Sequence, residues 1–215
     1  VTAVSLYDTE LMRNAFNKEI IYIPNGTNLT ECIEENNTND PYVLFSAGRI
    51  YNIKGLHLLL EAANKINLKN MIKVAGNLDR VPSYKQEVLQ GIKTLNVDIV
   101  GMIKEKSELM QIVNKAELFV FPSLYEAMSM MLLEVASMKT PIIASDIPAN
   151  KAVFTSDEVL FFKSGDTEDL ATKMQYAFSH MEKMRERAEK AYTKLIDNYT
   201  WAKIAQQYQA IYNKL

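Results

Sequence analysis

Short apolar runs alternate along the chain with longer segments in which apolar residues recur every three or four positions. Continuous runs of this kind are typical of strands buried on both faces of a parallel sheet, and the longer segments are typical of amphipathic helices. We predict strands at about 20–23, 42–47, 71–75, 97–100, 118–121, 141–144 and 159–162, and helices at about 8–18, 55–67, 83–95, 105–115, 130–138 and 167–180. Strands that alternate with helices form βαβ units, so the pattern predicts an α/β fold with a doubly wound parallel sheet.

The carboxyl end is predicted to be helical as well. Residues 181–198 form a charged amphipathic segment, and residues 201–215 place Trp201, Ile204 and Tyr208 on one face. Residues 27–40 are rich in Asn, Thr and acids, which indicates a solvated loop or linker.

Composition narrows the class of protein. The chain has 215 residues, 48% of them hydrophobic, which is enough for a sizeable core. The formal net charge is −2, so no broad basic field argues for nucleic acid as a partner. The single cysteine, Cys32, cannot build a disulfide framework or a thiolate metal site. We find no signal peptide and no apolar run of the ~18 residues that a membrane span needs, which favours a cytoplasmic location.

The segment Phe121–Val135 carries the most informative pattern. Ser129 is a good N-cap for a helix that starts near Met130, so Glu126 lies in the loop after a buried strand and Glu134 in the second turn of the helix. Ligands bind at this edge of open α/β sheets, and a helix N-terminus suits a phosphate. Strand–loop–helix units with an acid at each end are also common in α/β proteins where the acids bind no ligand. As a site, they indicate a ligand with phosphates and hydroxyls, such as a nucleotide, a sugar or both.

A second strand-to-helix loop carries two cations. Gly48 lets the backbone turn after the strand, Arg49 follows at its carboxyl end, and Lys54 opens the next helical pattern. Arg offers a planar fork for phosphate oxygens and Lys a mobile point charge, so the pair suits a pyrophosphate. Taken alone, two such cations are more often solvated surface residues.

Six short motifs strengthen these interpretations by their order. They are Ile-Pro-Asn-Gly at 23–26, Gly-Arg-x4-Lys-Gly at 48–55, Val-Ala-Gly at 74–76, Val-Gly-x-Ile at 100–103, Phe-Pro-Ser-x-x-Glu-x7-Glu at 121–134 and Pro-Ile-Ile-Ala-Ser-Asp at 141–146. In this order and spacing they resemble the donor-binding half of the family 4 retaining glycosyltransferases, which have the GT-B fold. The resemblance runs from about Ile20 to the carboxyl end and implies a Rossmann-like domain, one half of a GT-B fold, with carboxyl-terminal helices.

The resemblance implies that the substrate is a nucleotide-diphosphate sugar and that its sugar is transferred with retention of configuration. Arg49 and Lys54 would hold the pyrophosphate and stabilise the charge that grows on the leaving phosphate, so they count as catalytic with Glu126. Gly48 and the amides near Ser129 and Met130 would complete the phosphate site.

The resemblance also separates the sugar, ribose and base contacts. Glu126 would face the donor sugar, where it binds hydroxyls or stabilises positive charge at the anomeric carbon. Glu134 would accept hydrogen bonds from the ribose hydroxyls, and the backbone around Met102 and Ile103 would read the base. We expect no cofactor and no metal, because the cations take the place of a metal and the sequence has no Asp-x-Asp motif.

The resemblance divides the chain into 1–23, the tail of an amino-terminal acceptor domain, 24–41, a hinge, 42–198, the donor domain, and 199–215, a helix that crosses back. The acceptor domain itself would lie outside this chain, and association with the inner face of a membrane through that part stays open. We therefore expect donor binding without transfer, and exposed apolar area near both ends of the chain.

Two other functions stay open from the sequence. One is a sugar-nucleotide epimerase on the same fold, although no histidine stands at a predicted strand end. The other is a non-catalytic nucleotide-sugar-binding module, although all four charged site residues are present. A thermal-shift panel of UDP, GDP, ADP and their sugars would show which of these ligands the chain binds.

The chain departs from the family at 126–129, where Glu-Ala-Met-Ser replaces the common Glu-Gly-Phe-Gly. If Ala127 or Ser129 needs a positive φ, strain of about 1 kcal/mol or more is expected. We interpret Met128, Met130 and Met131 as core filler, and His57 as a surface or packed histidine.

Overall fold

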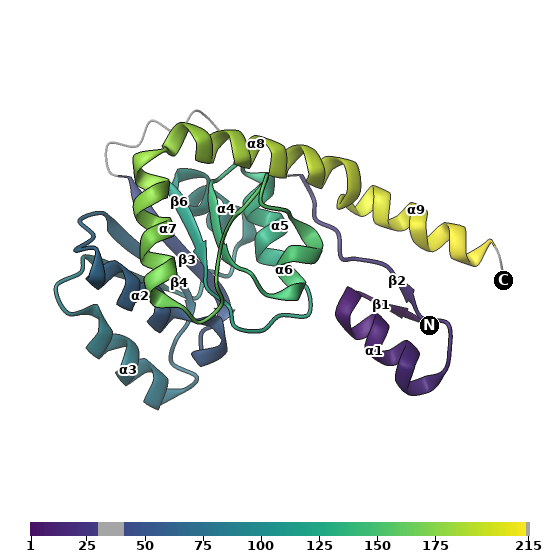
Figure 1. Cartoon of the computed structure of the whole chain (residues 1–215), viewed down its shortest axis with the longest axis horizontal. Coiled ribbons are helices and arrows are strands. Elements are labelled where there is room, and N and C mark those ends of the chain that lie inside the picture. The colour runs from purple at the N-terminus through teal and green to yellow at the C-terminus, as the bar shows by residue number, and fades with distance from the viewer. Residues whose placement is uncertain (30–40, 214–215) are drawn as a thin grey trace.

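The computed structural model describes residues 1–29 and 41–213. Its centre is a six-stranded sheet with the order β5-β4-β3-β6-β7-β8, in which every neighbouring pair is parallel (Figure 1). The strands are β3 (Tyr42–Arg49), β4 (Met71–Asn77), β5 (Val97–Gly101), β6 (Leu118–Phe121), β7 (Ile142–Ser145) and β8 (Leu160–Phe162). The doubly wound parallel sheet is confirmed. Most of the predicted linker, 30–40, lies outside the described residues.

The central strands β3, β6 and β7 are buried on both faces, and their successive side chains point to opposite faces. In β3, Val43 and Phe45 belong to one core, and Tyr42 and Leu44 belong to the other. The first core is covered by α2 (Leu56–Lys65), α3 (Pro82–Ile92) and α7 (Thr167–Ser179), and the second by α4 (Lys106–Lys115), α5 (Met130–Ser137) and α8 (Met181–Asn198). This is why the strands read as continuous apolar runs in the sequence.

The strand order reverses between β3 and β6. From β3 the chain moves outward to β4 and β5, and from β6 it moves outward on the other side to β7 and β8. Val43 of β3 pairs with Leu118 of β6, so the two strands lie side by side at the centre. The helices that follow these strands, α2 and α5, cover opposite faces of the sheet, and α/β sheets form a ligand crevice at such a reversal.

A short 3-10 helix, η1 (Asn52–Lys54), precedes α2 and is absent from the prediction. Gly55 follows it with a φ of +74°, and a Cβ there would lie 2.1 Å from the carbonyl oxygen of Pro122. Leu124 also donates its backbone N–H to the carbonyl of Ile53 at 2.8 Å. The loop after β3 therefore packs on the loop after β6, which requires glycine at position 55.

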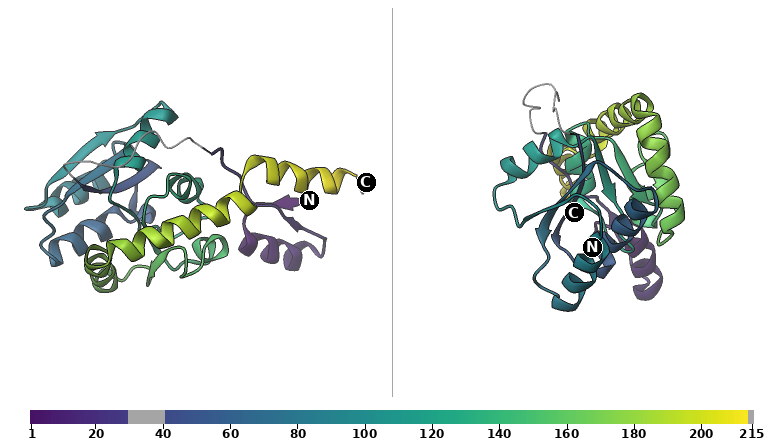
Figure 2. Two further views of the ribbon diagram at one scale, coloured as in Figure 1. Left: turned by 90° about the horizontal axis from the view of Figure 1, so that it is seen from above. Right: turned by 90° about the vertical axis from the view of Figure 1, so that its left-hand side faces the viewer.

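A small separate unit lies at the amino end. The parallel strands β1 (Thr2–Ala3) and β2 (Ile21–Tyr22) flank α1 (Leu6–Phe16), whose N-cap Ser5 accepts a hydrogen bond from Asp8 N–H. This bond starts the helix two residues before the predicted position 8. Figure 2 shows α9 (Trp201–Tyr212) extending from α8 beside this unit, away from the main sheet. The division of the chain into acceptor, hinge and donor parts stays a prediction.

The segment after β2 contacts the start of α9. Thr27 donates its N–H to the carbonyl of Tyr199 at 2.8 Å, and Trp201 donates its N–H to the carbonyl of Thr27 at 3.3 Å. Gly26 lies against Trp201, and a Cβ at Gly26 would lie 3.0 Å from atoms of that residue. The start of α9 is thereby fixed to the segment that leaves the amino-terminal unit.

Apolar side chains are exposed on both of these elements. In the amino-terminal unit, Tyr7 is 55% exposed, Leu11 53% and Phe16 65%; in α9, Trp201 is 44% exposed and Tyr212 68%. Apolar exposure near both ends of the chain agrees with the expectation from the sequence. Among the described residues, no helix has the length and apolar character needed to span a membrane.

Candidate functional site

A pocket of about 400 Å³ opens at the carboxyl ends of β3 and β6. It is lined by Ser46, Ala47, Gly48, Arg49, Tyr51, Lys54, Met102, Phe121, Glu126, Met128, Ser129, Met130 and Met131. The structure thus brings together all of the predicted site residues except Ile103 and Glu134. The pocket lies at the reversal of strand order, where the fold predicts a ligand.

An ion pair between Lys54 and Glu126 lies within this pocket. The Lys54 ammonium donates to Glu126 Oε1 at 2.6 Å, and the Ser123 hydroxyl donates to the same oxygen at 2.9 Å. The Lys54 side chain is 20% exposed and that of Glu126 11%, so the pair is largely desolvated. Arg49, in contrast to Lys54, is exposed.

The loop that carries Glu126 is unstrained. Neither Ala127 nor Ser129 has a positive φ, and the φ of Ser129 is −83°. The replacement of the two glycines common in the family therefore adds no left-handed backbone here. Met128 joins this loop to the hinge, because the Asn25 backbone N–H donates to Met128 Sδ at 3.1 Å.

The helix after this loop begins as predicted, with Ser129 at the N-cap position and Met130 as the first residue of α5. The predicted capping bond is absent, because the Ser129 side chain accepts no hydrogen bond from the first turn. Helix N-terminal amides need a partner, and the first residues of α5 line a pocket that also contains Arg49 and Lys54. The α5 N-terminus therefore adds donors suited to an anion.

Gly48 lines the pocket for a different reason from the one predicted. Its φ is not positive, and a Cβ at this position would meet no other atom within 4 Å. The strand irregularity lies between Ser46 and Arg49, where the pairing of β3 with β4 shifts register. Gly48 keeps this part of the pocket open rather than enabling a turn.

Glu134 and Ile103 lie outside the pocket lining. Glu134 is paired with Lys106, the first residue of α4, and its side chain is 13% exposed. Ile103 packs against the second core, whereas Met102 lines the pocket and is 57% exposed. The predicted contacts of these residues with ribose and base stay predictions.

The methionines around α5 have two roles. Met128 is buried and Met131 packs against the second core, as expected of core filler. Met128 and Met131 also line the pocket, beside the predicted site residues Met102 and Met130, and the sequence interpretation missed this role of Met128 and Met131. Their position between Glu126 and Glu134 is the signal that could have identified them. Residues of a loop and first helical turn that lie between two predicted site acids are expected at the same edge of the sheet as those acids.

His57 packs away from this pocket, as predicted. Its Nδ1 lies 2.9 Å from the Tyr84 hydroxyl, and the two rings meet edge to face at 5.6 Å. Burial raises the pKa of Tyr84 to about 12. Among the residues that the structure describes, no group of three or more His, Cys, Asp or Glu side chains could hold a metal ion. Metal independence stays a prediction.

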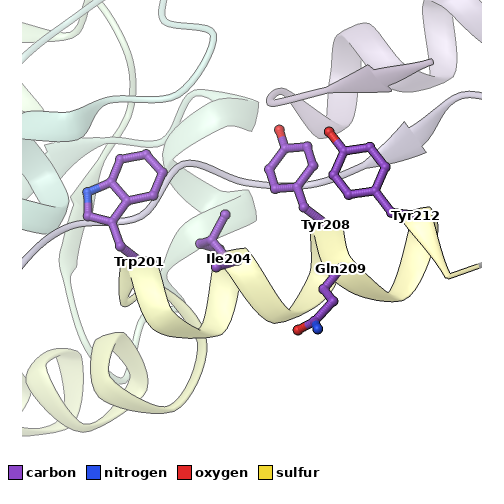
Figure 3. Close-up of a pocket in the computed structure, with 6 residues that line it drawn as sticks. Trp201, Ile204, Tyr208, Gln209 and Tyr212 are labelled. Atoms are coloured by element: carbon purple, nitrogen blue, oxygen red, sulfur yellow. The ribbon is translucent and has the colours of Figure 1, made fainter.

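A second, apolar pocket of about 520 Å³ lies along α9. It is lined by Trp201, Ile204, Ala205, Tyr208, Gln209 and Tyr212. Figure 3 shows the Tyr208 and Tyr212 side chains on the side of α9 that faces the strands of the amino-terminal unit. This surface carries no titratable group suited to catalysis at neutral pH.

Several solved structures share the fold of this chain. The chain superposes with a TM-score of 0.87 on a glycosyltransferase from Rickettsia africae, at 21% identity, covering 100% of this chain and 62% of that one. It superposes with a TM-score of 0.88 on Anabaena HepE in complex with UDP-glucose, at 16% identity, covering 100% of this chain and 64% of that one. These superpositions establish the fold, which is that of one half of a GT-B glycosyltransferase.

Sequence comparisons give the family. The chain is 26% identical over 189 residues to the alpha-maltose-1-phosphate synthase of Mycolicibacterium smegmatis, covering 82% of this chain and 49% of that protein. It thus spans about half the length of that relative. The family model for glycosyl transferases group 1 matches residues 30–194. The chain therefore belongs to the group 1 glycosyl transferases.

Proposed function

We propose that this chain binds a nucleotide-diphosphate sugar and supplies the donor site of a retaining glycosyltransferase. One observation carries the proposal. Arg49, Lys54, Glu126 and the first residues of α5 line a single pocket at the reversal of strand order, although they come from two distant parts of the sequence. Cations, helix amides and a carboxylate together match a ligand that has both phosphates and hydroxyls.

The chemistry assigned to the cations is stabilisation of the leaving group. When the bond between the anomeric carbon and the diphosphate oxygen breaks, its electron pair stays on that oxygen. Arg49 would bind the phosphate oxygens with its planar fork, and Lys54 would add a point charge. Both interactions strengthen as the negative charge grows, so they lower the barrier rather than merely tightening substrate binding.

The two acids would divide the rest of the donor between them. Both contacts of Glu126 within the described part of the chain use Oε1, which leaves Oε2 for a sugar hydroxyl or for the positive charge at the anomeric carbon. Glu134 would exchange its pair with Lys106 for the ribose hydroxyls. Backbone around Met102 and Ile103 would contact the base.

The acceptor would be held by a further domain. The exposed apolar side chains of α1 and the apolar pocket on α9 are suited to pack against such a domain. Because transfer needs an acceptor aligned with the anomeric carbon, we expect this chain alone to bind donor and to transfer no sugar. A cytoplasmic location and membrane association through that domain remain part of the proposal.

The epimerase and the non-catalytic module are less well supported. The matched family is one of glycosyl transferases, and no histidine lines the pocket within the described residues. The resemblance in sequence motifs supports two further parts of the proposal, namely retention of configuration at the anomeric carbon and a hexose as the transferred sugar.

A thermal-shift panel tests the proposal. UDP, GDP and ADP, each alone and as its glucose derivative, are mixed with the purified chain. We expect the ligands that carry one of the three bases to raise the melting temperature of the chain. The Glu134→Gln variant should lose much of that rise, because the ribose contact is removed. A chain that no member of the panel stabilises would refute donor binding.

A further inference from the structure

A series of buried polar side chains runs behind the Glu126 loop. Asn150 in α6 (Pro148–Val153), Ser145 at the end of β7 and Ser123 after β6 are each at most 1% exposed. The Asn150 side-chain nitrogen donates to the Ser145 carbonyl at 2.9 Å and to the Ser145 hydroxyl at 3.2 Å. The Ser145 hydroxyl donates to the Ser123 carbonyl. The Ser123 hydroxyl then donates to Glu126 Oε1 at 2.9 Å, so the series ends at the pocket.

The direction of these hydrogen bonds is consistent from one end to the other. A serine hydroxyl has one proton to donate and lone pairs to accept. Ser145 accepts from Asn150, so its single proton is directed at the Ser123 carbonyl. Ser123 donates its own proton to Glu126, which requires an oxygen that accepts, as an ionised carboxylate does.

Stability of the core does not explain this series. Asn150 Oδ1 is buried and has no hydrogen-bond partner among the described residues. A buried polar atom without a partner is unfavourable, and an apolar side chain could fill the same space without that cost. A network that is incompletely satisfied at one end and terminates on a pocket carboxylate is typical of residues that serve a site.

We propose that Ser123, Ser145 and Asn150 are positioning residues that hold the Glu126 carboxylate against Lys54 and toward the donor sugar. Asn150 fixes the orientation of Ser145, Ser145 fixes the backbone carbonyl of Ser123, and the Ser123 hydroxyl fixes Glu126 Oε1. The inference rests on the proposed function, because Glu126 is there assigned to the sugar.

The proposal predicts a selective effect on the sugar part of the donor. Without the Ser123 hydroxyl, Glu126 Oε1 keeps Lys54 as its partner and the side chain gains freedom to turn. The nucleotide part is held by other residues, so its binding should change little. A purely structural role would instead lower stability and leave the preference for the sugar unchanged.

The test compares Ser123→Ala and Ser145→Ala with a matched control, Thr140→Val. Thr140 is also 1% exposed and donates a buried hydrogen bond to the Val113 carbonyl at 2.9 Å, but it precedes β7 at the opposite edge of the sheet. Each variant therefore removes one buried hydroxyl. Melting temperatures confirm folding, and Ser123→Ala alone decides the outcome if Ser145→Ala does not fold.

The first measurement is calorimetric titration with UDP and UDP-glucose, or with the GDP or ADP pair if the wild-type chain selects that base. We expect the ratio of the Kd for the nucleotide sugar to the Kd for the nucleotide to rise roughly 3–10-fold in both serine variants, the size of one typical hydrogen bond. Ser123→Thr should restore it, and Thr140→Val should leave it unchanged. An unchanged ratio in Ser123→Ala, or an equal rise in Thr140→Val, overturns the proposal.

The second measurement needs no ligand. The Lys54 ammonium group is observed by ¹⁵N NMR at low temperature and assigned by its loss in Lys54→Arg. We expect its signal to be sharp in the wild type and in Thr140→Val, and broadened in Ser123→Ala and Ser145→Ala, because Glu126 no longer holds one position. An identical signal in all variants overturns the positioning of Glu126. If the wild-type chain binds no nucleotide, only the proposed function is overturned. The NMR signal of Lys54 then decides by itself whether the serines position Glu126.

Discussion

Lys54 and Glu126 lie 72 positions apart in the sequence, yet the Lys54 ammonium lies 2.6 Å from Glu126 Oε1. Both side chains are mostly buried, so water screens their attraction only in part. A diphosphate that binds Lys54 has to compete with this carboxylate or share the ammonium with it. The pair holds Glu126 in the pocket, and under the proposed function it would weaken binding of a nucleotide that carries no sugar.

Replacing Glu126 with Gln should therefore tighten binding of the free nucleotide diphosphate. The gain should be about 0.5–1 kcal/mol, the size of a partly exposed ion pair. Affinity for the nucleotide sugar should fall relative to the nucleotide, because the charged contact with the sugar is lost. Calorimetric titration of both ligands measures the two effects. Weaker binding of the free nucleotide in Glu126→Gln would show that the ion pair does not compete with phosphate.

The two cations should differ in their effect on stability. Arg49→Ala and Lys54→Ala should each weaken nucleotide diphosphate binding by roughly 1.5–3 kcal/mol, the range for charge-assisted hydrogen bonds. Arg49 is exposed, so its removal should leave the free energy of unfolding within about 0.5 kcal/mol of the wild type. Lys54→Ala should lower it by about 1–3 kcal/mol, because Glu126 is left buried without its cation.

The control for both variants is Lys85→Ala, which removes an exposed lysine paired with Asp79. It should change neither nucleotide affinity nor stability appreciably. Denaturant unfolding and titration of the three variants separate the effects. Equal stability of the Lys54 and Arg49 variants would contradict the structural importance of the ion pair.

The sheet could be predicted because its central strands are buried on both faces. The central strands β3, β6 and β7 begin as continuous apolar runs, and the segments between most of the strands show helical periodicity. α6 was missed because its six residues are too few for a periodic pattern, and its start is set by Pro148 after β7. η1 was missed because three residues carry no periodicity at all.

Only part of the site could be predicted. Arg49, Lys54 and Glu126 follow strand ends, which the sequence reveals, and they do line one pocket. Their mutual distances depend on the packing of Gly55 against Pro122, a contact between loops 67 residues apart. The pairing of Glu134 with Lys106 likewise depends on how α4 lies beside α5. Sequence periodicity carries no information on such contacts between loops and helices.

Gly55→Ala should therefore affect stability and the site together. A Cβ at position 55 would lie 2.1 Å from the Pro122 carbonyl oxygen, and the alanine would also have to adopt a φ of +74°. We expect a loss of roughly 2–4 kcal/mol in the free energy of unfolding, together with weaker nucleotide binding, because the η1 loop must move.

Gly101→Ala is the matched control for the backbone strain. Gly101 has a φ of +81°, but a Cβ at this position would have no other atom within 4 Å. It should lose only about 1 kcal/mol, the cost of a left-handed conformation alone. Equal losses in the two variants by chemical denaturation would mean that the contact with Pro122 adds nothing.

Stability should fall in alkaline solution because of buried tyrosines. Burial raises the pKa of Tyr42, Tyr84 and Tyr199 from 10.0 to about 12. The unfolded chain releases these protons at lower pH than the folded chain, so the free energy of unfolding is unaffected below pH 10 and falls as the pH rises from 10 to 12. Each tyrosine contributes a slope of up to about 1.4 kcal/mol per pH unit.

Tyr42→Phe should reduce this alkaline slope, because it removes one of the three buried hydroxyls. Denaturant unfolding at several pH values, with tyrosinate absorbance followed in parallel, measures the slope. A free energy of unfolding that stays constant from pH 10 to 12 would contradict the burial of these hydroxyls.

The most direct measurement for the whole account is calorimetric titration of nucleotide sugars into the wild-type chain and into an Arg49→Ala, Lys54→Ala double variant. We predict that the wild type binds at least one of UDP-, GDP- and ADP-glucose, and that the double variant loses most of that affinity while it remains folded. Wild-type affinity in a folded double variant, or no binding of any of the three to the wild type, would contradict the assignment of this pocket to the donor.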